Sequence, residues 1–237
     1  MLTVAILAGG QAKRLRPMTE TTPKSLLELN GEPFAVHQLR LLRLKGIRRV
    51  VMCVGHLGRL IQKAIGDGAG LGIEVDYSFD GPTLLGTAGA VKSALTKLGD
   101  SFFVLYGDSY LPCDYAAIAR GFEDSGAMAL MTVFRNEGKW DASNVEFEKG
   151  KILAYSKTER TPGMRHIDYG LGVFRSEAFD QVPEAKTYDL AELYADLLGR
   201  RQLAAYEVRE RFYEIGSPAG LRETTEFLAA QKAAQYP

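Results

Sequence analysis

The stretch that decides the fold is residues 2–27, which read LTVAILAGGQAKRLRPMTETTPKSLL. Leu2 to Leu7 form an apolar, β-branched run that is typical of a buried strand. The run ends at Ala8-Gly9-Gly10, and a buried strand that enters a glycine turn delivers backbone N–H groups to a phosphate at the carboxyl end of a sheet. Glycine allows close approach because it has no Cβ. The segment predicts a phosphate-binding loop. The planar guanidinium of Arg14 can donate two hydrogen bonds to phosphate oxygens, and the ammonium of Lys24 adds a compact positive charge.

Two common nucleotide-binding patterns are absent from this loop. It does not follow G-x-G-x-x-G, and it lacks the G-K-[ST] ending of a P-loop. A strand that ends in a Gly-Gly turn beside ordinary surface cations is therefore the alternative interpretation. The longer pattern favours phosphate binding, because Pro17 and Thr19 follow Arg14 at fixed spacing and Pro23 precedes Lys24.

This longer pattern resembles the signature of the sugar-1-phosphate nucleotidylyltransferases, L-[AG]-G-G-x-G-[TS]-R-L-x-P-x-[TS]…P-K. The chain departs from it at Ala12, where the family has a third glycine, and at Lys13, where the family has Thr or Ser. The resemblance implies nucleotidyl transfer with Arg14 and Lys24 as the catalytic cations. It covers nearly the whole chain.

The composition is that of a globular protein without a global charge. The 237 residues include 29 basic and 29 acidic side chains, and 46% are hydrophobic. Such a chain can bury a substantial core, and its balanced charge gives no field to attract nucleic acid or an anionic membrane. Cys53 and Cys113 are expected to be buried thiols. No signal peptide or membrane span is visible, so we expect a cytoplasmic protein that binds neither nucleic acid nor membrane.

The segments after the first loop predict a doubly wound sheet. A helix is expected over 34–45, a strand over 48–54, a helix to about 65 and strands over 73–78 and 101–106. This alternation favours a parallel sheet with helices on both faces. Strand-like segments at 127–134, 145–147, 152–155 and 166–174 have few helices between them and indicate a β-rich extension. The expected fold is α/β: a Rossmann-like, doubly wound, mixed but mainly parallel sheet with a small β-rich extension that binds the acceptor.

The remaining segments complete this expectation. Asp189 is the predicted N-cap of a helix to about 199, strands are expected over 204–208 and 212–215, and Pro218 opens a final helix. We interpret residues 1–237 as a single nucleotidyltransferase domain, with a nucleotide-binding half at 1–125 and a sugar-phosphate-binding half at 126–237. No hexapeptide repeat is present, so no carboxyl-terminal β-helix is expected. The protein is expected to be a monomer or a small homo-oligomer.

A second glycine-containing segment, residues 80–90, reads DGPTLLGTAGA. It crosses a loop and enters a helix whose predicted N-cap is Thr87. In the resembling family the matching segment lies beside the base and ribose, with Asp80 or Gly81 toward the base edge. The nucleotide-binding residues that the resemblance implies are Leu7, Ala8, Gly9, Gly10, Asp80, Gly86 and Thr87.

Two carboxylates are candidates for a metal. Asp108 follows the strand 101–106 at the sheet edge that also carries the first loop, and the family's Gly-Asp aspartate binds a divalent metal. Glu214 stands where the family has an aspartate in [WFY]-x-D-[IVL]-G-[TS]-P. We expect both to hold Mg²⁺, which prefers oxygen ligands, with Glu214 acting directly or through one water. An ordinary turn aspartate and an ordinary strand-end glutamate are the alternative interpretations.

The acceptor site is expected in the second half of the chain. Tyr155-Ser156-Lys157 stands where the family often has a Glu-Lys pair, and the family's lysine approaches the sugar phosphate. The strand at 166–174 corresponds to the family strand over the sugar, where Asp168 and Tyr169 would contact hydroxyls. The implied sugar-phosphate-binding residues are Lys157, Asp168, Tyr169 and Gly170.

The implied reaction converts an NTP and a sugar 1-phosphate into an NDP-sugar and pyrophosphate. The sugar-phosphate oxygen attacks the α-phosphorus in line with the departing pyrophosphate, which requires positioning and charge stabilisation rather than a protein nucleophile. Arg14 would stabilise the leaving group, and Lys24 would hold the α-phosphate and the attacking phosphate.

The substrates are predicted from two shorter similarities. PKSLLELNGEPF (23–34) and LLGTAGAVKSAL (84–95) look most like the D-glycero-D-manno-heptose-1-phosphate and mannose-1-phosphate guanylyltransferases. The compact uridylyltransferases for N-acetylmuramate or glucose 1-phosphate are the next hypothesis. A non-catalytic nucleotide-sugar sensor is disfavoured because Arg14, Lys24 and Asp108 are all present. A nicotinamide-dependent oxidoreductase is disfavoured by the missing dinucleotide fingerprint.

Overall fold

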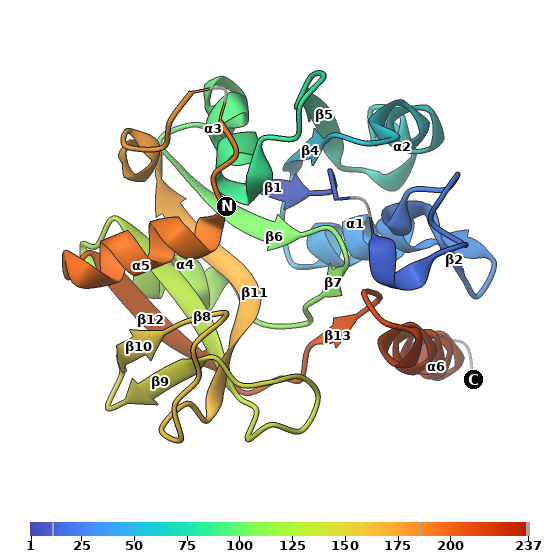
Figure 1. Cartoon of the computed structure of the whole chain (residues 1–237). Coiled ribbons are helices and arrows are strands. Elements are labelled where there is room, and N and C mark those ends of the chain that lie inside the picture. Colours follow the sequence, from blue (N-terminus) through green and yellow to red (C-terminus); the bar gives the residue numbers. More distant parts are fainter. Residues whose placement is uncertain (11, 185, 236–237) are drawn as a thin grey trace.

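The structure is a computed structural model that describes residues 1–10, 12–184 and 186–235, except the side chains of residues 13 and 233–235 (Figure 1). Its longer strands are β1 (Thr3–Leu7), β4 (Arg49–Val54), β5 (Glu74–Phe79), β6 (Ser101–Tyr106), β8 (Ala129–Arg135), β9 (Val145–Glu148), β10 (Lys151–Tyr155), β11 (His166–Arg175) and β12 (Leu203–Val208). Its helices are α1 (Phe34–Leu44), α2 (Gly58–Ile65), α3 (Gly86–Leu98), α4 (Tyr115–Ser125), α5 (Leu190–Gly199) and α6 (Pro218–Gln235). Two short pairs join β2 (Glu28–Leu29) to β3 (Glu32–Pro33) and β7 (Ser109–Tyr110) to β13 (Tyr213–Glu214).

The predicted strands and helices agree with these bounds to within two residues. The helix α4 is an element that the sequence analysis did not predict. Asp114 is its N-cap and accepts a hydrogen bond from the Ala117 N–H at 3.0 Å. An aspartate before an apolar run is a usual helix-start signal, so this helix could have been found.

The nine longer strands of the described residues form one mixed sheet in the order β5-β4-β1-β6-β11-β8-β12, with β9 and β10 continuing from β11. The strands β5, β4, β1 and β6 are parallel, whereas β11 is antiparallel to both β6 and β8. The chain moves from β1 to β4 on one side and returns to β6 on the other, so a topological switch point lies beside β1. The predicted doubly wound, mixed and mainly parallel sheet is confirmed.

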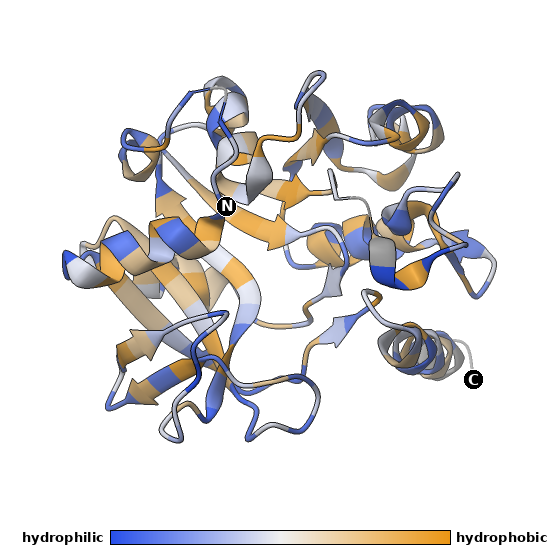
Figure 2. Cartoon of the chain, in the orientation of Figure 1, coloured by the Kyte–Doolittle hydropathy of each residue, from blue (hydrophilic) through white to orange (hydrophobic). Residues whose placement is uncertain are grey.

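The two faces of the sheet are covered by different helices. Val4 and Ile6 of β1 pack in a core with residues of α1, α2 and α4, whereas Ala5 packs in a second core with α3 and α5. This alternation follows from the period of two along a strand. The central strands β1 and β6 are apolar along their length (Figure 2). They are therefore buried on both faces, as parallel strands between helix layers are.

The second half of the chain continues this sheet. Phe103 of β6 lies opposite Val173 of β11 in an antiparallel register. The register of β11 against β8 shifts between Asp168 and Gly172, and Gly170 has a φ of +94° within this irregularity. A glycine is suited to that position because a side chain rarely adopts positive φ. The extra residues of β11 do not change its alternation, because Ile167 before the shift and Leu171 and Val173 after it lie in the same core.

The strand β13 brings the last segment of the chain back to the end of β6. Glu214 pairs with Ser109 of β7, and the Ile215 N–H donates to the carbonyl of Asp108 at 2.9 Å. Ile215 then packs with Phe34 and Leu228 in a third, smaller core that holds α6 against α1. Asp108, directly before β7, and Glu214 of β13 are thus brought close together, although more than a hundred residues separate them.

The helices α3 and α5 cap one another, and the prediction that Thr87 is the N-cap of its own helix is wrong. Helix α3 begins at Gly86 after Leu85, which makes no side-chain cap. The Thr87 N–H instead donates to the Asp189 carboxylate at 3.2 Å, and the Thr87 hydroxyl accepts from the Leu190 N–H at 2.7 Å. The first N–H groups of a helix need partners, and here each helix supplies them to the other. Asp189 is confirmed as the N-cap of α5.

Cys53 and Cys113 are both buried free thiols, as predicted. Burial raises the pKa of each to about 12, so both stay protonated at neutral pH. Among the described residues, no helix is both long enough and apolar enough to cross a membrane.

The junction of α3 and α5 yields a prediction for stability. Gly86 has a φ of +75°, and a Cβ there would lie 2.6 Å from the carbonyl oxygen of Tyr188. Gly86→Ala should lower the free energy of unfolding by about 2 kcal/mol or more, because backbone strain and backbone overlap add. Urea denaturation measures this. Gly70→Ala is the matched control, since a Cβ at Gly70 would have no heavy atom within 4 Å; a change as small as that of the control would refute the role of Gly86.

Candidate active site

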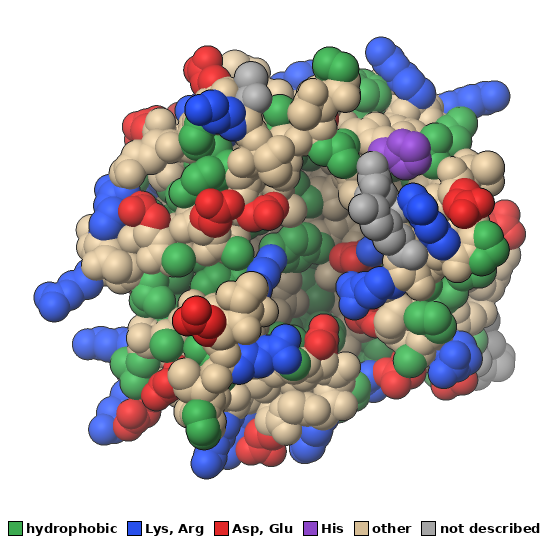
Figure 3. Space-filling view, in the orientation of Figure 1, with side chains coloured by type: hydrophobic (Ala, Val, Ile, Leu, Met, Phe, Trp, Pro, Cys, Tyr) green, Lys and Arg blue, Asp and Glu red, His purple; other side chains and the backbone are tan. Residues whose placement is uncertain are grey.

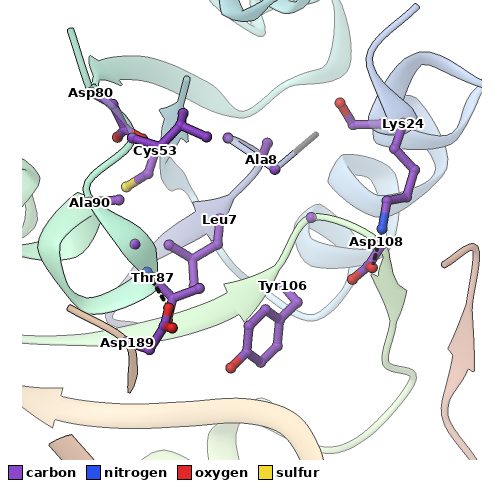
Figure 4. A pocket seen from close by; sticks show the side chains of 16 residues that line it. Leu7, Ala8, Lys24, Cys53, Asp80, Thr87, Ala90, Tyr106, Asp108 and Asp189 are labelled. Carbon is purple, nitrogen blue, oxygen red and sulfur yellow. Dashed lines mark hydrogen bonds and ion pairs between the residues drawn. The ribbon is translucent and has the colours of Figure 1, made fainter. Parts of the chain in front are cut away.

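A cavity of about 240 Å³ opens at the carboxyl ends of β1 and β6, at the topological switch point (Figure 4). Ligands bind at this place in open α/β sheets. The first cavity, as we call it, is lined by Leu7, Ala8, Gly9, Gly10, Lys24, Ser25, Cys53, Asp80, Leu84, Gly86, Thr87, Ala90, Tyr106, Gly107, Asp108 and Asp189. All seven predicted nucleotide-binding residues are among them.

A second cavity of about 750 Å³ adjoins the first and extends toward β11, β13 and α6. Tyr106 and Asp108 line both cavities. The space-filling view shows this hollow face with Lys, Arg, Asp and Glu side chains along its walls (Figure 3). The second cavity contains the remaining predicted residues: Arg14, Lys157, Asp168, Tyr169, Gly170 and Glu214.

Asp108 and Lys24 form an ion pair where the cavities meet. The Lys24 ammonium lies 2.7 Å from Asp108 Oδ2, and both side chains are partly exposed (Figure 4). Lys24 comes from the short helix Lys24–Leu26, which follows Pro23. The pair places a cation and a carboxylate side by side at the edge of the sheet.

The turn that carries Asp108 is fixed by three hydrogen bonds, which tie it to the first loop and to α1. The Gly107 N–H donates to the Leu7 carbonyl at 2.9 Å, which ties the turn to the first loop. The Gln38 amide of α1 donates to the carbonyls of Tyr106 and Ser109 at 3.0 and 2.7 Å. Gln38 is 1% exposed. A buried polar group needs partners, and these two carbonyls flank the turn, so Gln38 holds Asp108 in place.

Arg14, Asp108 and Glu214 converge on Gly216. A Cβ placed on Gly216 would lie 2.7 Å from Glu214 Oε2, 3.2 Å from Asp108 Oδ2 and 3.4 Å from Arg14 Nη2. The glycine leaves room where a side chain would separate these groups. The structure thus brings together the predicted leaving-group cation and both predicted metal ligands.

The Glu214 carboxylate also serves the loop that begins α6. It accepts a hydrogen bond from the Ser217 hydroxyl at 2.6 Å and another from the Gly216 N–H. A carboxylate at a helix start is favourable because the free N–H groups carry partial positive charge. Its metal-binding role stays a prediction, and these bonds fix where the carboxylate lies.

The two carboxylates fit the requirements of Mg²⁺. Among the described residues there is no cluster of three or more His, Cys, Asp or Glu side chains that could enclose a metal. Mg²⁺ is usually bound by one or two carboxylates together with substrate phosphates and water. The open cradle at Gly216, with an oxygen donor on two sides, suits that mode.

Asp80 lies at the far end of the first cavity. Its Oδ2 would be 3.3 Å from a Cβ on Gly9 and 3.0 Å from one on Gly55, so it sits against two glycine backbones. Burial raises its pKa, and a hydrogen bond from the Leu85 N–H opposes this rise. Asp80 offers a hydrogen-bond acceptor to a ligand in this part of the cavity.

Gly86 and Thr87 line the first cavity, and the polar groups of Thr87 are already used. The N–H and hydroxyl of Thr87 both donate to Asp189, at 3.2 and 3.1 Å (Figure 4). The start of α3 therefore forms a wall of the cavity rather than a free set of N–H donors. Asp189, which the sequence analysis named only as a helix cap, lines the cavity from the second half of the chain.

Asp168 and Lys157 both line the second cavity. The Asp168 carboxylate accepts from the Gly170 N–H at 3.0 Å. Burial raises the pKa of Asp168, while the charge of Lys157 and the Gly170 hydrogen bond lower it. Gly170 thus contributes through its backbone to holding Asp168.

Tyr169 borders the second cavity from a buried position. Its side chain is 2% exposed and packs with Ile167, Leu171 and Val173 on the sheet face opposite Asp168. Its phenol has no hydrogen-bond partner within the described chain and lies in the apolar core. Tyr169 nevertheless lines the second cavity, so its predicted hydroxyl contact stays a prediction. Asp168 also remains a candidate for such a contact.

Three residues of the site were missed as site residues: Gln38, Tyr106 and Asp189. Gln38 interrupts the apolar face of a predicted helix, which is a signal for a buried polar role. Tyr106 precedes the Gly-Asp pair and was counted only as a strand residue. Asp189 reaches the cavity through long-range packing, which no local sequence pattern predicts.

Comparisons with known proteins agree with this geometry. The chain matches the profile of the nucleotidyl transferase family over residues 3–231. It is 27% identical over 234 residues to the N-acetylmuramate alpha-1-phosphate uridylyltransferase of Neisseria meningitidis, covering 96% of this chain and 98% of that protein. It is 28% identical over 219 residues to the mannose-1-phosphate guanylyltransferase catalytic subunit beta of Xenopus tropicalis, covering 90% and 61%.

A further relative is the UTP–glucose-1-phosphate uridylyltransferase of Synechocystis, at 29% identity over 201 residues, with 78% of this chain and 52% of that protein covered. The chain thus spans nearly the whole Neisseria protein, but about half to three fifths of the other two.

Solved structures share the fold at low identity. HddC from Yersinia pseudotuberculosis, complexed with GMP-PN, has a TM-score of 0.80 and 21% identity, with 96% of this chain and all of that chain covered. A Bacillus anthracis structure assigned as a glucose-1-phosphate thymidylyltransferase, in complex with a sucrose, has a TM-score of 0.84 and 21% identity, covering 96% and 95%.

The family match runs through both halves of the sheet and includes the residues around both cavities. The resemblance noted in the first loop is therefore confirmed: this chain belongs to the nucleotidyl transferase family, as a sugar-1-phosphate nucleotidyltransferase.

Proposed function

We propose that the chain makes an NDP-sugar from GTP and either D-glycero-D-manno-heptose 1-phosphate or mannose 1-phosphate. The observation that supports this reaction is that the two cavities meet at Tyr106 and Asp108. An NTP in the first cavity and a sugar 1-phosphate in the second would bring the α-phosphorus and the attacking oxygen to the same point. Proximity of this kind supplies much of the rate enhancement in phosphoryl and nucleotidyl transfer.

In the proposed mechanism a phosphate oxygen of the acceptor forms a bond to the α-phosphorus. The bond from the α-phosphorus to the bridging oxygen of the β-phosphate breaks, and pyrophosphate leaves. Lys24 holds the α-phosphate at the junction, and Arg14 stabilises the charge that develops on the leaving group. Asp108 and Glu214 would hold Mg²⁺, which when bound neutralises phosphate charge.

A second candidate function rests on the Neisseria relative. That N-acetylmuramate alpha-1-phosphate uridylyltransferase matches this chain over nearly the full length of both proteins. A uridylyltransferase for N-acetylmuramate or glucose 1-phosphate is therefore the alternative, and a non-catalytic nucleotide-sugar sensor is a third.

The test is pyrophosphate release over a matrix of four NTPs and a panel of sugar 1-phosphates, with magnesium present. Highest kcat/KM with GTP and heptose or mannose 1-phosphate supports the proposal. Highest kcat/KM with UTP and N-acetylmuramate or glucose 1-phosphate selects the alternative. No release from folded protein, combined with tight binding of an NDP-sugar, selects the sensor.

Arg14→Ala should lower turnover by about 10²–10³, because one preorganised charged donor to the leaving group is lost. Its stability should hardly change, since the side chain is exposed. Arg14→Lys should also be impaired, because an ammonium cannot replace the bidentate fork. Arg16→Ala is the control, since Arg16 is exposed nearby and lines neither cavity. Equal turnover in the Arg14→Ala variant and the parent would refute the role.

Asp108→Asn keeps the shape of the side chain and removes its charge. Activity should collapse at low magnesium and recover at most partly as the metal is raised. A magnesium titration of the initial rate measures this, with Asp124→Asn on the exposed end of α4 as the control. Unchanged magnesium dependence would make Asp108 an ordinary turn residue that pairs with Lys24.

Glu214→Gln should raise the magnesium concentration needed for half-maximal rate by about tenfold or more, as loss of a group that holds or orients a metal does. Glu214→Asp should retain part of the function, because it keeps the charge but shortens the reach. Glu226→Gln, on an exposed turn of α6, is the matched control. If both Glu214 variants lose stability while their magnesium dependence stays that of the parent, Glu214 acts only in the hydrogen bonds to Gly216 and Ser217.

A further inference from the structure

Tyr106 occupies the junction of the two cavities. It and Asp108 are the two residues of the described chain that line both. Tyr106 ends β6, and its backbone is fixed by the Gln38 amide at 3.0 Å and by pairing opposite Leu7 of β1. Its ring extends from that anchored backbone below Leu7, away from Lys24 and Asp108 (Figure 4). The wall between the cavities is therefore an aromatic side chain on a firmly held backbone.

The Tyr106 side chain contacts Lys157 of the second cavity. The Lys157 ammonium donates to the Tyr106 hydroxyl at 3.5 Å and lies 5.6 Å from the centre of its ring. A cation within about 6 Å of an aromatic ring is attracted by the negative face of the ring. No carboxylate of the described residues lies within ion-pair distance of Lys157. Tyr106 is thus the principal direct contact that orients this ammonium.

We propose that Tyr106 is a positioning residue that holds the Lys157 ammonium at the junction of the cavities, ready for the phosphate of the acceptor. This inference rests on the proposed function, because it assumes that the second cavity binds a sugar 1-phosphate. In this inference the neutral Tyr106 side chain sets the position of the charged Lys157 side chain.

A neutral anchor suits this task better than a carboxylate. A carboxylate in direct ion-pair contact with Lys157 would compete with the incoming phosphate for the ammonium. Asp168 is near enough for the Lys157 charge to lower its pKa, but it forms no ion pair with Lys157 among the described residues. The hydroxyl and the ring direct the ammonium without cancelling its charge.

A purely structural role is the competing explanation, and Tyr155 offers a matched control for it. Tyr155 is also largely buried, and its ring centre lies 5.9 Å from that of Tyr194 in the neighbouring core. Its hydroxyl has no hydrogen-bond partner among the described residues, and it lines neither the first nor the second cavity. Removing that hydroxyl should leave acceptor binding unchanged and stability unchanged or slightly raised.

The experiment is a double-mutant cycle on the parent enzyme with its best substrates. Tyr106→Phe should raise the KM for the sugar 1-phosphate about three- to tenfold, the usual effect of losing one hydrogen bond, while the KM for the NTP changes little. Tyr106→Leu should raise it further, because the ring contact is lost as well. In the Lys157→Met background, Tyr106→Phe should have less than about a twofold effect, since residues that act as one unit are not additive. Tyr155→Phe should match the parent.

The cycle also separates this inference from the proposed function. If the parent shows no sugar-1-phosphate-dependent release of pyrophosphate, the proposed function fails and the inference with it. If the parent is active and Tyr106→Phe raises the acceptor KM by the same factor with and without Lys157, Tyr106 acts independently of Lys157 and the inference is wrong. An unchanged acceptor KM in Tyr106→Phe and Tyr106→Leu also overturns it. Tyr106→Phe removes a single oxygen atom, so it decides the question even where Tyr106→Leu fails to fold.

Discussion

The hydrogen bonds that clamp the turn after β6 are the constraint on which the rest of the site depends. The Gly107 N–H binds the Leu7 carbonyl, and Gln38 holds the carbonyls on either side of the turn. The Asp108 carbonyl accepts from Ile215, which attaches β13. Each of these contacts is buried or backbone-mediated, so the turn has little freedom. These hydrogen bonds fix the positions of the first loop, α1 and the last strand relative to the Asp108 carboxylate.

The two halves of the chain are joined by contacts that also build the walls of the cavities. Strand β11 extends the sheet beside β6, and helices α3 and α5 supply each other's end groups through Thr87 and Asp189. Because helix ends must satisfy their free N–H groups, this docking contributes partners that the local sequence of α3 does not provide. Asp189 lines the first cavity as a consequence, so the nucleotide side of the site is partly formed by the second half of the chain.

The charged side chains of the site gather around the two cavities. Lys24 pairs with Asp108, and Arg14, Asp108 and Glu214 approach one another around Gly216. In the second cavity, Lys157 lies near Asp168, whose pKa burial raises and the lysine lowers. Under the proposed function, these cations and carboxylates would receive a metal with a triphosphate in the first cavity and a monophosphate ester in the second. The balanced net charge of the whole chain conceals this local order.

The sequence alone determined the strands, most of the helices and the class of the sheet, because period-two and helical apolar patterns are local and strong over 2–7, 34–45 and 101–106. It also predicted Arg14, Lys24 and Asp108 as site residues, because the first two belong to one short motif and the third follows a strand end; all three line the cavities. Tertiary structure decided what depends on long-range contact. It made Thr87 a partner of Asp189 instead of a cap, turned the Tyr169 phenol into the core, and placed Gln38 and Tyr106 in the site. A local pattern fixes the direction of a backbone, but which side chains meet depends on sheet register and on the faces that pack together.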